Sequence, residues 1–109
     1  MLGQLLETFV FQELKRQASW NDRPVQFNHF RDKDGVEVDI VLEQAGKLTG
    51  IEIKAAATVT KKDFRGLKKL QETTGERFAA GAVMYDGDNA IGFDNKLYAI
   101  PIRALWETT

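Results

Sequence analysis

The chain has 109 residues, of which 43% are hydrophobic and 28% are charged, and it contains no cysteine. These values are ordinary for one globular domain with a single core, and the lack of thiols excludes disulfides and cysteine-based metal or catalytic sites. The net charge of −1 argues against nucleic-acid binding by the whole surface, so any such binding has to be local. No signal-peptide pattern and no apolar run approaching the roughly 20 residues of a membrane span occur, which predicts a cytoplasmic protein that does not enter the membrane.

A first helix is predicted over residues 2–18, because apolar residues recur there at helical spacing. Glu7 lies at the edge of this apolar stripe and Glu13 lies inside it, where a carboxylate without a partner is costly. We expect one of the two to have a partner, although a glutamate at such a boundary can also reach water. No N-cap residue precedes the helix, as in a domain excised from a longer protein, but a native start is also compatible with this. The apolar positions are Leu2, Leu5, Leu6, Phe9, Val10 and Leu14.

A turn is predicted at Asn21–Pro24 and a first strand at 25–30, where apolar and polar residues alternate. His29, the only histidine, lies in this strand beside aromatic residues. We expect it to be packed rather than to bind a metal, because no second histidine completes a zinc site. The segment Asp32–Gly35 predicts a tight turn into the next strand.

Residues 36–43 and 48–54 form a predicted β-hairpin, because both segments alternate with period two. Apolar residues form one face, and charged residues form the other. A three-residue loop would mix the two kinds of residue on each face, whereas a four-residue loop from Gln44 to Lys47 keeps them apart. The apolar face is predicted to hold Val36, Val38, Ile40, Leu42, Ile51 and Ile53. The longer loop pairs Glu43 with Leu48, Asp39 with Glu52 and Glu37 with Lys54.

Asp39 and Glu52 then face each other with side-chain roots roughly 5 Å apart, and they repel unless a positive charge lies between them. One or two carboxylates with water are typical ligands of Mg²⁺, whose remaining positions can take phosphate oxygens. The alternative is an ordinary solvated face, on which Glu37 and Lys54 form a cross-strand ion pair.

The run Gly35-Val36-Glu37-Val38-Asp39, followed by Glu52-Ile53-Lys54, resembles the PD-(D/E)XK nuclease superfamily in the form of the archaeal-type Holliday junction resolvases. Residues 31–54 and 64–70 are still more similar to an uncharacterised C-terminal domain that follows AAA-type ATPase modules in bacteria and archaea. The resemblance covers residues 5–106. It departs from the pattern at Phe30, where tryptophan is expected, and at Ala55–Ala57, where serine is usual after the lysine.

The resemblance implies a metal-dependent nuclease in which Asp39, Glu52 and the carbonyl of Ile53 bind Mg²⁺ or Mn²⁺. It also implies that a first-helix glutamate reaches this site, for which Glu7 is the first choice and Glu13 the second. Lys54 would orient the attacking water and stabilise negative charge, because an ordinary lysine pKa near 10.4 suits a general base poorly. The implied partners are DNA, including branched DNA, a second copy of the chain and a linked or associated AAA-type ATPase module.

A second helix is predicted from Thr60, which begins a capping box with Asp63, to Gly75, which ends it. Its inward positions are apolar and its outer face is basic, which makes it the candidate surface for DNA phosphates. The alternative is a solvated helix face. The basic residues are Lys61, Lys62, Arg65, Lys68 and Lys69.

The apolar segment 78–85 predicts a buried strand, which a right-handed crossover places parallel to the strand of Glu52. A turn at 86–89, edge strands at 90–93 and 97–100 and a short helix at 101–106 complete the chain. The predicted fold is a single α/β domain over 1–109. Its restriction-endonuclease-like core consists of a helix, a three-stranded meander, a helix and a strand, with a mixed central sheet.

We therefore expect a metal-dependent enzyme that hydrolyses DNA phosphodiester bonds. Two other functions stay open from the sequence: a catalytically weak or inactive docking module of an AAA-type ATPase, and a module that binds nucleic acid without cutting it. The chain lacks a G-x-x-x-x-G-K-[ST] nucleotide-binding loop, so it is not itself predicted to hydrolyse ATP.

Overall fold

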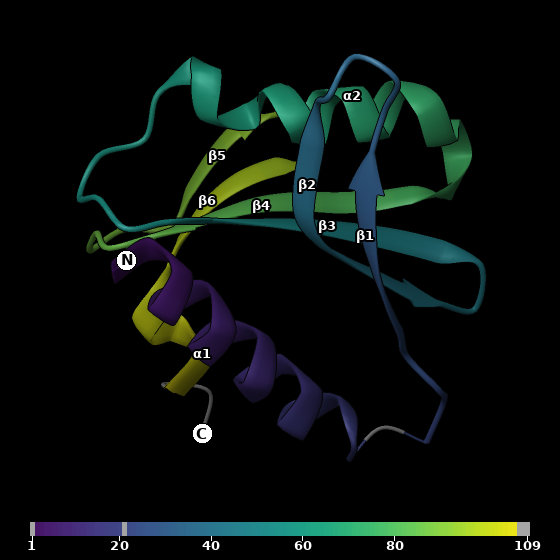
Figure 1. Cartoon of the computed structure of the whole chain (residues 1–109), viewed down its shortest axis with the longest axis horizontal. Coiled ribbons are helices and arrows are strands. Elements are labelled where there is room, and N and C mark those ends of the chain that lie inside the picture. The colour runs from purple at the N-terminus through teal and green to yellow at the C-terminus, as the bar shows by residue number, and fades with distance from the viewer. Residues whose placement is uncertain (1, 21, 107–109) are drawn as a thin grey trace.

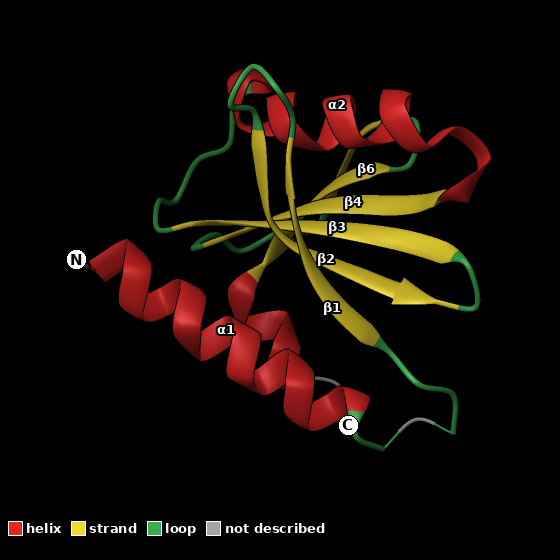
Figure 2. Cartoon of the chain, turned by 45° about the vertical axis from the view of Figure 1, so that its right-hand side comes forward, coloured by secondary structure: helices red, strands yellow, loops and turns green. Residues whose placement is uncertain are grey.

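A computed structural model describes residues 2–20 and 22–106 as a six-stranded sheet with a helix on each face (Figures 1 and 2). The strand order is β1-β2-β3-β4-β6-β5. This arrangement confirms the predicted α/β class and the mixed central sheet. None of the described helices is long and apolar enough to cross a membrane. The elements are α1 (Leu2–Ala18), β1 (Gln26–Arg31), β2 (Glu37–Gln44), β3 (Lys47–Lys54), α2 (Arg65–Thr74), β4 (Phe78–Tyr85), β5 (Ile91–Asp94) and β6 (Leu97–Pro101), with 3-10 helices at Lys61–Phe64, Gly75–Arg77 and Ile102–Trp106.

The meander is antiparallel from β1 to β3, and β4 lies parallel to β3, both as predicted. The prediction for β6 was wrong, because this strand is not at an edge. It lies between β4 and β5, runs parallel to β4 and buries Leu97 and Ala99. The edge position belongs to β5, whose four residues are all exposed. The described part of the predicted turn at 21–24 is irregular, and Asn21, like Met1, lies outside the described residues.

The hairpin of β2 and β3 has the predicted register, with Glu43 opposite Leu48. Its loop is shorter than the predicted four residues, because Gln44 and Lys47 also pair. Only Ala45 and Gly46 form the turn, with φ angles of 53° and 81°. Two consecutive residues with positive φ are typical of the two-residue turns whose twist matches that of the flanking strands. The shorter loop extends the pairing by one step at the turn, and the pairs from Glu43 to Ile40 keep the predicted register.

The register of β1 on β2 shifts by one residue at His29, so that His29 lies opposite both Asp39 and Ile40. This bulge adds one residue to β2, and it reverses the face on which the next side chain points. Val38 therefore packs in the cluster beneath α2, whereas Ile40 packs in the cluster against α1. The prediction that Val38 and Ile40 share one face was wrong for this reason.

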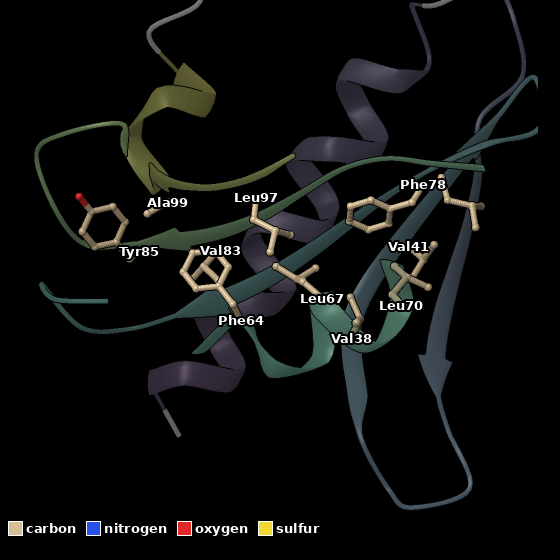
Figure 3. Close-up of a cluster of buried hydrophobic side chains, with 11 residues drawn as sticks. Val38, Val41, Phe64, Leu67, Leu70, Phe78, Val83, Tyr85, Leu97 and Ala99 are labelled. Carbon is tan, nitrogen blue, oxygen red and sulfur yellow. The ribbon is translucent and has the colours of Figure 1, made fainter. Parts of the chain in front are cut away.

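Each helix covers one hydrophobic cluster. On the α2 face, Figure 3 shows Phe64, Leu67 and Leu70 pointing toward the strands. On the α1 face, Val10 is fully buried, but Leu5 and Phe9 are exposed, contrary to the prediction that the whole apolar stripe packs on the sheet. The ring of Phe9 contacts that of Trp106 instead, with centroids 5.4 Å apart. The α1 face of the sheet is completed by Ile102 and Leu105 of the closing 3-10 helix, in addition to Val10, Ile40, Ile51 and Met84.

The basic helix begins as predicted, because Thr60 and Asp63 form the capping box of the first 3-10 turn, which continues into α2. It ends at Gly75, whose φ of 57° suits glycine. Near its start, α2 approaches β2 closely at Gly66. A Cβ atom at this position would lie 2.2 Å from the carbonyl oxygen of Glu37, so only glycine allows this contact.

We expect Gly66→Ala to destabilise the domain by about 1–3 kcal/mol, because a buried backbone contact leaves no room for a methyl group. A loss of stability would be informative, because the higher helix propensity of alanine would by itself stabilise the helix by up to about 1 kcal/mol relative to glycine. The free energy of unfolding in urea measures the effect. Gly92→Ala is the matched control, because a Cβ at Gly92 meets nothing within 4 Å. Equal stability of Gly66→Ala and the parent would contradict the close approach.

Candidate metal-binding site

Two carboxylates meet where the pairing of β2 and β3 ends. The last backbone pair joins Ile40 and Ile51. Beyond it, the Asp39 N–H donates a hydrogen bond of 2.6 Å to Oε1 of Glu52. The Ile53 N–H donates one of 3.0 Å to Oδ2 of Asp39. Each carboxylate therefore accepts a backbone amide from the opposite strand, and the structure brings together the two acids that the hairpin register predicted to face each other.

Burial is the main cause of the raised pKa values of this pair. Burial, and after it the charge of Asp39, raise the pKa of Glu52 to about 8, against the opposing effect of the hydrogen bond from the Asp39 amide. Burial also raises the pKa of Asp39, against the stabilising hydrogen bond from the Ile53 amide. Near neutral pH the pair therefore tends to retain a proton, and a cation could take the place of that proton.

The predicted cross-strand contact between Lys54 and Glu37 does not form. The Nζ of Lys54 lies 2.6 Å from Oδ2 of Asp63, in a pair whose side chains are 29% and 23% exposed. Glu37 instead lies 3.3 Å from Nε2 of His29 and 3.9 Å from Arg31. The prediction failed because pairing of the two strands ends before this step. The alternative of an ordinary Glu37–Lys54 ion pair on a solvated face is therefore wrong.

Asp63 is a site residue that the sequence reasoning assigned only to helix capping. Its Oδ2 accepts the Thr60 amide at 2.7 Å, as a capping box requires, and also accepts the Lys54 ammonium. Burial opposes ionisation of Asp63, but these hydrogen bonds outweigh it and lower the pKa. No signal in the sequence links Asp63 to Lys54, because the capping box alone explains an acid at this position.

The four charges of the hairpin, Glu37, Asp39, Glu52 and Lys54, line one cavity of about 400 Å³. Among the residues that the structure describes, no group of three or more His, Asp or Glu side chains has the arrangement of a preformed metal site. A cation here would therefore have two carboxylate ligands and complete its coordination with water, backbone or substrate oxygens, as Mg²⁺ commonly does. Ile53, Asp63, Lys62 and Arg65 are among the other residues that line the cavity.

The structure separates the two candidate glutamates of α1. Burial raises the pKa of Glu7, and the charge of Asp39 raises it further, so Glu7 lies within electrostatic range of the acid pair. Glu13 interacts within its own helix, with Arg16 and with Gln17 at 2.9 Å. His29, which was expected to be packed, has a side chain that is 54% exposed and is hydrogen-bonded to Glu37. Its position opposite Asp39 follows from the bulge, which the strand pattern did not reveal.

Four of the five predicted DNA-binding residues divide into two pairs. Lys62 and Arg65 line the acidic cavity, whereas Lys68 lies 3.6 Å from Asp94 and Lys69 lies 3.9 Å from Asp32. Within the described part of the chain, Lys61, Lys62 and Arg65 have no ion pair or hydrogen-bonded side-chain partner. A second cavity of about 390 Å³ lies between α2 and the β1–β2 turn, and its basic lining residues are Lys61, Arg65, Lys68 and Lys69.

The fold and this site define a mixed α/β domain with a cavity that combines half-buried acids and unpaired cations. A family model described as "Domain of unknown function (DUF4143)" matches residues 2–105. The chain therefore belongs to this family. A comparison with curated proteins gave no match.

The raised pKa of Glu52 predicts a dependence of stability on pH in metal-free buffer. Because the folded state holds the proton up to about pH 8, whereas the ordinary pKa of a glutamate is 4.5, stabilisation by this group is complete below pH 4.5 and is lost as the pH rises through 8. One proton changes the unfolding free energy by at most about 1.4 kcal/mol per pH unit. We expect Glu52→Gln to flatten the decline between pH 5 and 8, measured by urea unfolding with a chelator present. An unchanged slope would contradict the raised pKa.

Proposed function

We propose that this domain hydrolyses DNA phosphodiester bonds with a Mg²⁺ or Mn²⁺ ion bound by Asp39 and Glu52. The observation that carries the proposal is the convergence of these half-buried carboxylates in one cavity with Lys54 and two unpaired cations, Lys62 and Arg65. The motif Asp39, Glu52, Lys54 is also the basis of the resemblance to PD-(D/E)XK nucleases. The restriction-endonuclease-like nature of the core belongs to the same proposal.

The donor set fits a hard divalent cation. Each carboxylate uses one oxygen, Oδ2 of Asp39 or Oε1 of Glu52, to accept a backbone amide, and this leaves its second oxygen for a ligand. The amides also fix the orientation of both side chains before a cation binds, which lowers the entropic cost of binding. The Ile53 carbonyl is the proposed third protein ligand, and Glu7 would act directly or through a water molecule.

When bound, the ion would lower the pKa of a water molecule and stabilise charge on the phosphate oxygens. The chain itself supplies the positioning groups. Lys54 carries three N–H donors, of which one reaches Asp63, so two remain to orient the attacking water and to contact a phosphate oxygen. Lys62 and Arg65 border the same cavity, where they would neutralise the phosphates next to the scissile bond.

Two other functions are compatible with the same residues. In a docking module of an AAA-type ATPase, linked or associated, the acid pair would bind no substrate. In a non-cutting nucleic-acid module, the cations would bind DNA without turnover. Cation binding separates the nuclease from the docking module, and turnover separates it from the non-cutting binder. Branched DNA as substrate and a homodimer as the active form are further parts of the nuclease proposal.

We expect slow but measurable cleavage of flapped or four-way DNA with Mn²⁺, lost in Lys54→Ala without loss of folding. Wild type and variants are purified in parallel and compared on linear, flapped and four-way substrates. Lys47→Ala is the matched control, because Lys47 lies at the opposite end of β3 and contacts the carbonyl of Glu76. Asp39→Asn is expected to abolish Mn²⁺ binding in calorimetry.

Equal cleavage by wild type and Lys54→Ala would indicate a contaminating nuclease and overturn the proposal. Unchanged Mn²⁺ affinity in Asp39→Asn would remove the metal site. DNA binding without cleavage would support the non-cutting module instead, and the absence of both cation and DNA binding would support the docking module.

The division of the basic helix predicts unequal contributions to DNA binding. Replacing Lys62 and Arg65 with Gln removes two unpaired cations at the acidic cavity. It should weaken binding on all sequences and reduce the salt slope by about 2, since each phosphate contact contributes about 0.9. Replacing Lys68 and Lys69 with Gln, which removes the same charge, should have a smaller effect because each is near an aspartate. Fluorescence titrations at several salt concentrations, with Ca²⁺ in place of Mn²⁺, measure both pairs. Equal losses would show that the whole helix binds.

A further inference from the structure

We propose that Asp63 is a positioning residue of this site, which holds the Lys54 ammonium in place and joins it to the helix that carries Lys62 and Arg65. The inference rests on the proposed function, because it assigns a role in the same reaction. Asp63 is not part of the Asp39, Glu52, Lys54 motif, and its assignment to the capping box predicted no role in catalysis.

The geometry supports a fixed ion pair rather than a casual surface contact. The Lys54 Nζ to Asp63 Oδ2 distance is 2.6 Å, and both side chains are about three-quarters buried. A free lysine side chain carries about 2 kcal/mol of rotamer entropy, and exposed ion pairs rarely hold it in one geometry. Burial reduces the competing hydration here, so the pair can restrict the ammonium to a narrow region at Asp63.

The same carboxylate oxygen joins two parts of the fold. Oδ2 of Asp63 accepts the amide of Thr60 at 2.7 Å and the ammonium of Lys54. Thr60 precedes the first turn of the basic helix, and Lys54 is the last residue of β3. Asp63 therefore holds both ends of the loop formed by residues 55–60. It also sets the distance between Lys54 and the cations Lys62 and Arg65, which would contact phosphates.

The pair also keeps Lys54 away from the acids. Lys54 and Glu52 are two residues apart on one strand and line one cavity with Asp39, so an untethered ammonium would be attracted to the carboxylates. In that position it would compete with a cation for them and would no longer face substrate. Asp63 prevents this collapse by giving Lys54 a carboxylate partner other than the acid pair.

The test uses Asp63→Asn, which keeps an oxygen acceptor for the Thr60 amide but removes the charge. We expect single-substrate cleavage with Mn²⁺ to show a kcat about tenfold lower and an unchanged KM, with partial recovery in Asp63→Glu. Glu43→Gln is the matched control, because it removes a carboxylate of the Arg77 ion pair outside the cavity. Thermal unfolding of each variant shows whether the helix cap is retained.

A second measurement follows Lys54 without relying on cleavage. Brief acetylation followed by peptide mass spectrometry gives the modification rate of Lys54 relative to Lys47 in the same molecule. We expect this ratio to rise at least threefold in Asp63→Asn and to stay at the parent value in Glu43→Gln. An unchanged ratio, or a kcat equal to or above that of the parent, would overturn the positioning role. If the wild-type protein binds Mn²⁺ but cuts no DNA, the proposed nuclease activity is overturned. The Lys54–Asp63 contact is tested separately, by the acetylation ratio.

Discussion

The rest of the structure depends on one constraint, which is the cost of placing two carboxylates between strands that no longer pair. Backbone amides at this point would lose their partners, and buried acids would lose their hydration. The crossed hydrogen bonds between Asp39 and Glu52 and the opposite amides satisfy part of both needs. They leave the negative charge itself uncompensated, and for this reason the neighbouring elements matter to the site.

Three features of the fold open this space. The bulge opposite His29 turns Val38 toward α2 and separates β2 from its regular course. Gly66 lets the start of α2 approach the Glu37 carbonyl, which brings the basic helix against the same end of β2. The parallel pairing of β3 with β4 continues to Lys54, whereas the pairing of β2 with β3 already ends at Ile40 and Ile51. The cavity lies between these two strands and the start of the basic helix, which contributes Lys62, Asp63 and Arg65 to its lining.

The sequence predicted the features that follow from local alternation and missed those that depend on tertiary contacts. The register of β2 on β3 was predictable, because only one pairing keeps the charged residues on one face. The bulge was not, because it shows only in the placement of Val38 and Ile40 on opposite faces, which the alternating sequence does not indicate. The partner of Lys54 was also missed, because Asp63 is explained by its cap. The edge position given to β6 was wrong because short strands carry no local signal of their neighbours.

The charges that line the acidic cavity favour an order of binding in which the cation would bind first and a DNA phosphate second. Four acids, Glu37, Asp39, Glu52 and Asp63, face three bases, Lys54, Lys62 and Arg65, so the fully ionised cavity has a net charge of −1 and repels phosphates. A single bound divalent cation changes this to +1 and displaces the proton that the raised pKa of Glu52 retains. The cavity then attracts a phosphate instead of excluding it, even though the whole chain is slightly acidic. Under the proposed function, affinity for DNA would arise locally from the ion and the two unpaired cations beside it, and it would require no basic surface elsewhere.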